Sequence, residues 1–324
     1  QKIMLGITIF TIGLSKKLLL ADNFATFANL LFDGTKMGEV PHLMISWFGS
    51  LAYSFQLYFD FSGYSDMAVG LALFFGILIP NNFNAPFKAT NIIDFWQRWH
   101  ISLTKYIGEY LYTPLALRLT RLGFGRGPFI DTLCSLIVPT MIIFLIIGIW
   151  HGPSWTYVVF GGMHGLFLII NHLWRQLLPN KKKLGLVKTS LNWLITFLCV
   201  NASFVMFRSE NISIASEIYK GMLGLNGLNL GEYYSDNMVK GIVKGMWQVD
   251  NMPKETIIES FLLVFLGFIV VLVFPSSSKY TSLEQSDSKL FYVSSIWGPI
   301  ILAFLLVLSI MQLGKTSPFL YFQF

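Results

Sequence analysis

The sequence predicts an all-α, polytopic membrane protein, and composition is the first reason. Of its 324 residues, 54% are hydrophobic and only 12% are charged, and the mean hydropathy is +0.60. Ordinary soluble domains carry about 25% charged residues. The second reason is a series of apolar segments, several of them close to the roughly 20 residues that a helix needs to cross a bilayer.

Eight apolar segments are candidates for membrane helices. They comprise residues 3–20, 43–59, 67–79, 130–150, 155–173, 191–207, 257–274 and 293–313. The third segment is short, so we expect a half-spanning or broken helix there. Such backbone is tolerated at membrane depth where it is buried in protein or lines a cavity. The composition favours a single membrane domain over residues 1–324. Because the chain enters an apolar segment directly after Gln1, we expect that preceding helices are missing.

Loop charge gives an orientation. Residues 80–128 carry six basic side chains against two acidic ones, and the linker after Leu173 carries five basic residues and no acid. Under the positive-inside rule both loops are predicted to be cytoplasmic. The two spans between them agree with this, since they return the chain to the same side. The loop around Trp150 and Trp155 is then expected toward the outer face or within the membrane.

Several classes of function are disfavoured. The net charge of +6 comes from lysines and arginines clustered between apolar segments, so we interpret it as loop charge and expect no nucleic-acid partner. Cys134 and Cys199 both lie in apolar segments, which favours buried small residues over a disulfide framework. The sequence has no Gly-x-Ser-x-Gly elbow and no P-loop, so a covalent serine mechanism is not expected.

His151 is the sharpest catalytic candidate. It lies in Trp150-His151-Gly152, directly after the apolar run 133–149, and Pro153 ends any helix there. Ionisable residues at membrane depth are costly and usually functional. A buried neutral imidazole is a good general base, because burial disfavours its charged form. The alternative is a histidine that only bonds a neighbouring carbonyl, and the sequence weighs the two about evenly.

His100 lies in a polar, aromatic-rich stretch, residues 95–103. As a helix this stretch would place Trp96, Trp99 and Leu103 on one face, and would lie at the membrane interface or dip back into the protein. The alternative is a belt of interfacial tryptophans with a solvated Arg98 and His100. Taken alone, the stretch favours that alternative.

The remaining polar candidates have weaker local signals. His164 lies among glycines that permit tight helix packing, which supports a structural role as much as a functional one. Asp60 and Asp66 belong to the polar stretch 56–66, and we expect them to line an aqueous cavity or to cap broken helix ends around Gly63. The histidine spacings match no compact ligand motif, so no metal site is expected.

Taken together, several ordered motifs resemble the membrane-bound O-acyltransferase (MBOAT) family. They are Gly13-Leu14-Ser15-Lys16-Lys17 through Ala21-Asp22, Tyr58-Phe59-Asp60-Phe61-Ser62-Gly63-Tyr64-Ser65-Asp66, Pro80-Asn81-Asn82-Phe83-Asn84-Ala85-Pro86-Phe87, Phe95-Trp96-Gln97-Arg98-Trp99-His100, Tyr110-Leu111-Tyr112-Thr113-Pro114-Leu115, Gly148-Ile149-Trp150-His151-Gly152, Phe207-Arg208 and the C-terminal Ser317 to Phe324. Within the family the chain resembles the branch of the bacterial alginate O-acetyltransferase subunit, and the D-alanyl transfer protein of teichoic acid synthesis is a relative.

The resemblance implies a fold and a site. The fold would be an MBOAT-type ring of tilted transmembrane helices, with re-entrant or interfacial segments, in a bacterial cell (inner) membrane. His151 would be the catalytic residue and His100 a second polar residue of the centre. Beyond the resemblance, we assign substrate contacts to further side chains. These are Trp99, Trp150, Arg98, Asp60, Asp66 and His164.

The function implied is transfer of an acetyl group toward hydroxyls of an extracytoplasmic polysaccharide. The donor would be acetyl-CoA or another acyl thioester, with no bound cofactor. Membrane lipid and a periplasmic or extracellular acetyltransferase would be partners. Two alternatives stay open at this point, namely D-alanyl transfer to teichoic acid and a non-catalytic transport or assembly subunit of a polysaccharide export complex.

Overall fold

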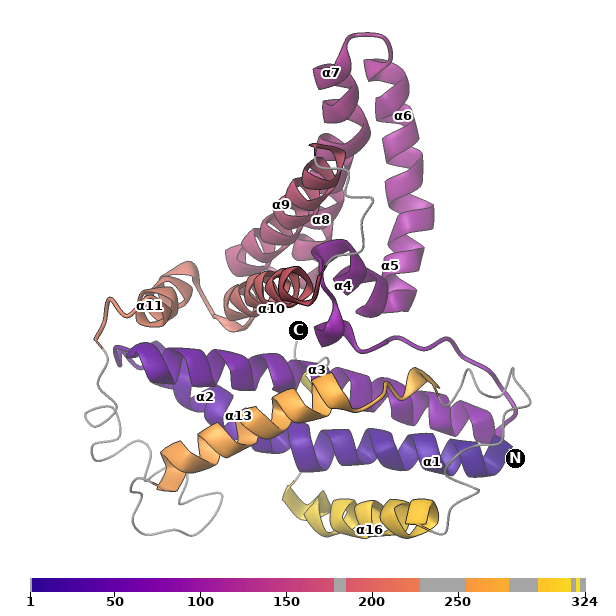
Figure 1. Cartoon of the computed structure of the whole chain (residues 1–324), viewed down its shortest axis with the longest axis vertical. Coiled ribbons are helices and arrows are strands. Elements are labelled where there is room, and N and C mark those ends of the chain that lie inside the picture. The colour runs from indigo at the N-terminus through magenta and orange to yellow at the C-terminus, as the bar shows by residue number, and fades with distance from the viewer. Residues whose placement is uncertain (1, 178–184, 228–254, 280–296, 316–318, 321–324) are drawn as a thin grey trace. The chain divides into compact units, whose positions relative to one another are not determined.

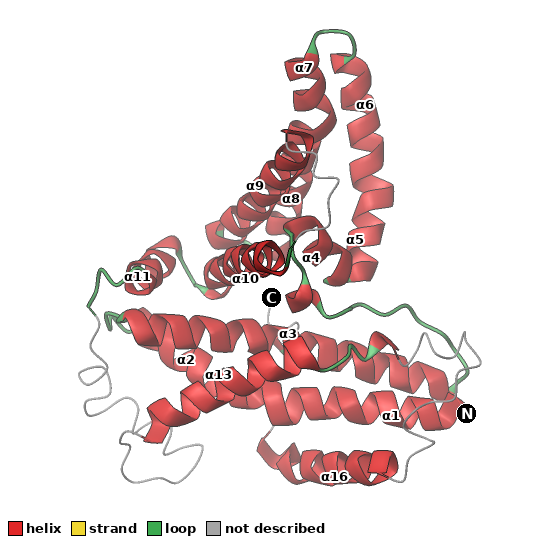
Figure 2. Cartoon of the chain, in the orientation of Figure 1, coloured by secondary structure: helices red, strands yellow, loops and turns green. Residues whose placement is uncertain are grey.

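The computed structural model describes residues 2–177, 185–227, 255–279, 297–315 and 319–320, and these form helices joined by loops, with no strand among them (Figures 1 and 2). Four of the described helical stretches are long and apolar enough to cross a membrane. They are Lys2–Lys36, Pro128–His151, Trp155–Leu177 and Leu186–Arg208. The all-α membrane class is therefore confirmed, whereas the ring arrangement and its re-entrant segments stay predictions.

The chain divides into two compact units. The first comprises residues 1–79 and 208–324, and the second comprises residues 80–207. The predicted single-domain organisation stays a prediction.

The first unit is built on two long helical stretches. Its elements are α1 (Lys2–Ser15), the π-helical turn η1 (Lys16–Ala21), α2 (Asp22–Lys36), α3 (Leu43–Phe74), α11 (Ile212–Met222), α13 (Glu255–Val273), α16 (Trp297–Gln312) and the short η6 (Leu313–Lys315). Helix α3 packs along α1 and α2, and α16 packs against α1 (Figure 1). The expected segments 257–274 and 293–313 correspond to α13 and α16, except that residues 293–296 lie outside the described part.

The predicted break around Gly63 is wrong. Helix α3 runs without interruption for 32 residues, so segments 43–59 and 67–79 are not two separate helices. Gly63 serves a different purpose. A Cβ atom built on Gly63 would lie 2.7 Å from the carbonyl oxygen of Gly13, and one built on Gly13 would lie 2.6 Å from that of Gly63. The glycine therefore allows close backbone approach between helices and does not end α3.

About two helical turns away along the same helix pair, Gly6 and Gly70 make a second contact of this kind. Their built Cβ atoms would lie 2.8 Å and 2.7 Å from the partner's carbonyl oxygen. Gly6 and Gly13 are seven residues apart on α1, and Gly63 and Gly70 are seven residues apart on α3. The four glycines therefore form one stripe along the antiparallel contact between these helices. Next to the stripe, Leu5, Ile9, Val69 and Leu73 form a buried apolar cluster.

The second unit contains short helices followed by three long ones. They are η2 (Pro86–Lys88), α4 (Ile92–Arg98), α5 (Ile101–Ile107), η3 (Gly108–Tyr112), α6 (Thr113–Gly123), α7 (Pro128–Thr132), η4 (Leu133–Ile137), α8 (Val138–His151), α9 (Trp155–Leu177) and α10 (Leu186–Arg208), of which Arg208 belongs to the first unit. The predicted segments 130–150, 155–173 and 191–207 are confirmed, each slightly longer than expected.

Glycines also bring α8 and α9 together. A Cβ atom on Gly148 would lie 2.3 Å from the carbonyl oxygen of Tyr157, and one on Gly161 would lie 2.1 Å from that of Phe144. The two backbones are therefore in van der Waals contact just before the connection at Gly152. This contact holds the end of α8 against the first turns of α9.

We predict that Gly63→Ala destabilises the protein by about 1–3 kcal/mol, because its methyl group would overlap a backbone oxygen that cannot rotate away. Gly162→Ala is the matched control, since its Cβ would meet nothing closer than Leu145 Cδ2 at 3.8 Å. The thermal unfolding midpoint in detergent measures both changes. Equal midpoints for the two variants would contradict the close α1–α3 contact.

Candidate active site

His100 lies at a sharp corner between α4 and α5. Its backbone is left-handed, with φ +45° and ψ +54°, which is uncommon for a residue other than glycine. The predicted continuous helical face over Trp96, Trp99 and Leu103 is therefore wrong, because the helix ends at Arg98 and a new one begins at Ile101. Strained backbone of this kind persists only where its surroundings determine it, and it is concentrated at functional sites.

The asparagine-rich loop before α4 fixes this corner. The backbone N–H of Ile101 donates to the carbonyl of Asn82 at 3.0 Å, and that of Ser102 donates to the Asn82 side chain at 3.1 Å. On the other side of the corner, the backbone N–H of Asn84 donates to the carbonyl of Arg98 at 3.0 Å. Both flanks of His100 are thus bonded to the same loop. Sequence reasoning missed Asn82 as a site residue, although its loop was among the quoted motifs.

Aromatic packing holds α4 from the other direction. Trp99 is buried among Phe83, Phe87, Phe95 and Phe204, with ring centroids 5.1–6.5 Å apart. It is 8% exposed, so most of its surface contacts protein.

Arg98 is held by neighbours within the second unit. Its Nε donates to Asp94 Oδ1 at 2.7 Å, one helical turn earlier, and one terminal nitrogen donates to the carbonyl of Asn84 at 3.3 Å. Both partners belong to the loop and helix that form the His100 corner. The guanidinium therefore strengthens the corner.

His151 is the last residue of α8, and aromatic rings surround it. The imidazole packs edge-on against Trp150 at 4.9 Å and Phe207 at 5.0 Å, and Phe160 and Tyr157 lie at 6.0 and 6.2 Å. Gly152 continues the chain at φ +150°, and a Cβ there would meet the Tyr157 ring at 2.8 Å. Only glycine therefore allows the chain to turn between His151 and Tyr157. Sequence reasoning missed Phe160, and it quoted Phe207 only within a motif.

The ring nitrogens of His151 are available. Within the described part of the chain neither nitrogen has a hydrogen-bond partner, and the residue is half-buried. The ring lies within electrostatic range of His100 and of His164. The structure therefore brings together three histidines that are far apart in the sequence.

His164 is bonded on both sides. The side chain is fully buried, Trp96 Nε1 donates to its Nδ1 at 3.2 Å, and its Nε2 lies 2.8 Å from Ser203 Oγ. Ser203 donates its own proton to the carbonyl of Val200 at 2.7 Å. Sequence reasoning did not identify Ser203, because nothing local marks it as a partner of a residue 39 positions earlier.

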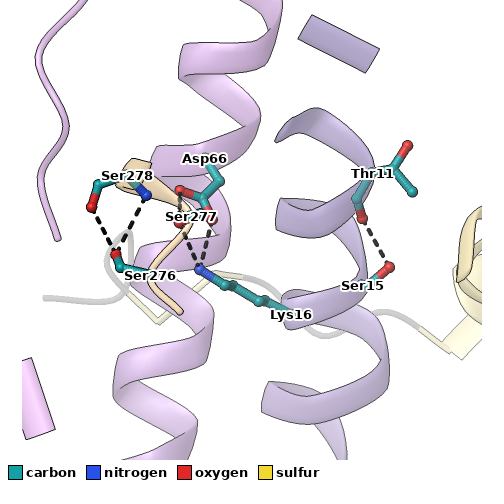
Figure 3. Close-up of polar contacts among 7 residues, drawn as sticks. All are labelled: Thr11, Ser15, Lys16, Asp66, Ser276, Ser277 and Ser278. Atoms are coloured by element: carbon teal, nitrogen blue, oxygen red, sulfur yellow. Dashed lines mark hydrogen bonds and ion pairs between the residues drawn. The ribbon is translucent and has the colours of Figure 1, made fainter. Parts of the chain in front are cut away.

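Asp60 and Asp66 belong to the first unit, where each forms an ion pair with one of two consecutive lysines. Lys17 Nζ lies 2.7 Å from Asp60 Oδ1, and the backbone N–H of Leu320 donates to Asp60 Oδ2 at 2.9 Å. Lys16 Nζ lies 2.6 Å from Asp66 Oδ2 (Figure 3).

Ser277 completes the second of these pairs. Its hydroxyl donates to Asp66 Oδ1 at 2.8 Å and accepts from Lys16 at 3.1 Å (Figure 3). All the carboxylate oxygens of Asp60 and Asp66 thus have partners in the protein. Within the described residues, no group of histidines, cysteines or acids has the arrangement of a metal site.

The helices and the buried histidine cluster define a multi-pass integral membrane protein with a candidate reaction centre in its second unit. Comparison with known proteins identifies the family. Residues 1–209 match the model of the MBOAT, membrane-bound O-acyltransferase family, and the chain belongs to that family.

Named relatives fall into three groups. The chain is 38% identical to the peptidoglycan O-acetyltransferase of Helicobacter pylori over all of its length and 57% of that protein. It is 40% identical to the probable alginate O-acetylase AlgI of Pseudomonas aeruginosa, over 72% of the chain and 41% of that protein. It is 32% identical to the teichoic acid D-alanyltransferase of Bacillus subtilis, over 49% of the chain and 40% of that protein. The chain thus spans between 40% and 57% of the length of these relatives.

His100 lies outside the four spanning helices, and burial lowers its pKa from 6.5 to about 4. Between these values the unfolded chain binds a proton that the folded chain does not. The contribution of His100 to stability is therefore complete above pH 6.5 and is lost as the pH falls toward 4.

We predict that His100→Asn makes the stability fall less steeply over that pH range. Asparagine does not titrate there, and it tolerates the left-handed backbone. The thermal unfolding midpoint, measured at several pH values in detergent, checks this. Parallel curves for the variant and the wild type would show that protonation of His100 does not contribute to acid unfolding.

Proposed function

We propose that this chain is the catalytic part of a bacterial cell-membrane O-acyltransferase. It moves an acetyl group from a cytoplasmic thioester, such as acetyl-CoA, toward hydroxyls of an extracytoplasmic polysaccharide. Family membership supports the reaction class, and the names of the relatives support an envelope polymer as acceptor. No bound cofactor is required for this reaction.

His151 is the general base in this proposal. It accepts the proton of the acceptor hydroxyl while the hydroxyl oxygen attacks the thioester carbonyl carbon. The C–O bond forms, the C–S bond breaks, and the imidazolium returns its proton to the leaving thiolate. The observation that carries the assignment is that neither ring nitrogen of His151 has a hydrogen-bond partner among the described residues, whereas both nitrogens of His164 are bonded.

His100 orients the donor or stabilises charge that develops on the carbonyl oxygen. Because its pKa is lowered to about 4, it is neutral near pH 7 and acts through an N–H group instead of a full charge. Trp150, which is 55% exposed, and Trp99 shape the pocket. Arg98 holds an anionic part of the donor with the N–H groups that Asp94 and Asn84 leave available.

Asp60 and Asp66 have a supporting role in the proposal. We assign them a structural role in the first unit, where their lysine pairs keep the charges compensated. Membrane lipid surrounds the protein, and a periplasmic or extracellular acetyltransferase receives the acetyl group if the chain acts as a relay. D-alanyl transfer is the second candidate, because a teichoic acid D-alanyltransferase is among the relatives.

We predict that His151→Gln lowers acyl transfer by about 10²–10⁴-fold at normal membrane abundance, since it removes the base and keeps a side chain of similar size. The assay uses the full-length protein in cells and measures ester-linked acetate on the exported polymer. His172→Gln is the matched control, as a half-buried histidine further along α9.

Two outcomes separate the candidates. Retained acetylation in His151→Gln would contradict the base assignment and favour a transport or assembly role. Mass spectrometry of the ester released from the polymer distinguishes acetate from D-alanine, so it decides between the two acyl groups.

A further inference from the structure

His164 has one arrangement of protons that satisfies all its contacts. Trp96 has only an N–H to offer, so Nδ1 of His164 must be an acceptor. Ser203 has one proton and donates it to Val200, so its oxygen accepts from Nε2 of His164. The imidazole is therefore neutral, with its proton on Nε2. Being fully buried and bonded at both nitrogens, it offers no group to a substrate.

These bonds join three elements around the proposed base. Trp96 lies on α4, which ends at the His100 corner. Ser203 lies on α10, one turn before Phe207, whose ring packs against His151 at 5.0 Å. His164 itself lies on α9 and connects them.

Phe160 provides the direct link to His151. It lies one turn before His164 on α9, and its ring is edge-on to both imidazoles, at 4.7 Å from His164 and 6.0 Å from His151. The stacked ring of Phe95 covers His164 from α4 at 6.2 Å. A displaced His164 would therefore move rings that touch His151.

We infer that His164 is a positioning residue for the reaction, which fixes α4 and α10 on α9 and so sets the placement of His100 and of the ring of His151. This inference rests on the proposed function. It assigns His164 a positioning role in place of the substrate contact expected from the sequence. The requirement is chemical, because the position needs one acceptor and one N–H donor about 2 Å apart on a single side chain. A glutamine amide supplies both, whereas leucine supplies neither.

The test compares His164→Gln with His164→Leu in the full-length protein. We expect His164→Gln to keep most of the transfer activity. We expect His164→Leu to lower kcat by about 100-fold with KM little changed, since displacement of a catalytic group by about 1 Å has effects of that size. A loss of equal size in both variants, or a loss expressed as a higher KM, would overturn the positioning role.

A second measurement does not depend on activity or on folding of the leucine variant. The ¹⁵N shifts of histidine-labelled wild-type protein, assigned by subtraction of the His164→Gln spectrum, report which nitrogen carries the proton. We expect a neutral ring protonated on Nε2 near pH 7. A proton on Nδ1 would refute the bonding pattern. Since these readouts concern His164 alone, they separate its role from the His151→Gln test of the proposed function.

Discussion

Polar groups buried among apolar helices must find their hydrogen-bond partners within the protein, because hydrocarbon offers none. Most of the arrangement described above follows from this constraint. Lys16 and Lys17 are paired with carboxylates of α3, Asp66 also receives a serine hydroxyl, and His164 bonds a tryptophan and a serine. Each pairing connects segments that are distant in the sequence. Satisfying the polar groups and fixing the tertiary arrangement are thus the same process.

The same constraint makes spare bonding capacity informative. A histidine whose nitrogens are both bonded holds structure, and one with free nitrogens in an aromatic enclosure is available for chemistry. His164 and His151 illustrate the two cases one helix apart, and Phe160 touches both. Within the described residues, an imidazole bonded at both nitrogens therefore lies close to one whose nitrogens have no hydrogen-bond partner. Sequence alone weighed them by their neighbours, and it could not see this difference.

The spanning helices could be predicted because they depend on local composition. The bounds of the apolar segments 130–150, 155–173 and 191–207 agree with those of the helices within a few residues. The break at Gly63 could not be judged locally, since a glycine signals equally a break and a close contact. Its partner, Gly13, lies 50 residues earlier. The corner at His100 was missed for a similar reason, because helical spacing was satisfied while Asn82, some twenty residues upstream, held the chain in a turn.

The π-helical turn η1 constrains how this chain can change over evolution. A π turn accommodates one residue more than an α-helical turn, so a single deletion within Lys16–Ala21 would restore regular α-helix. The deletion would also rotate α1 by about 100° relative to α2. Gly6 and Gly13 would then face away from α3, while α2 kept its own contacts with that helix. Changes of length in this stretch are therefore not tolerable, even where they remove no polar contact.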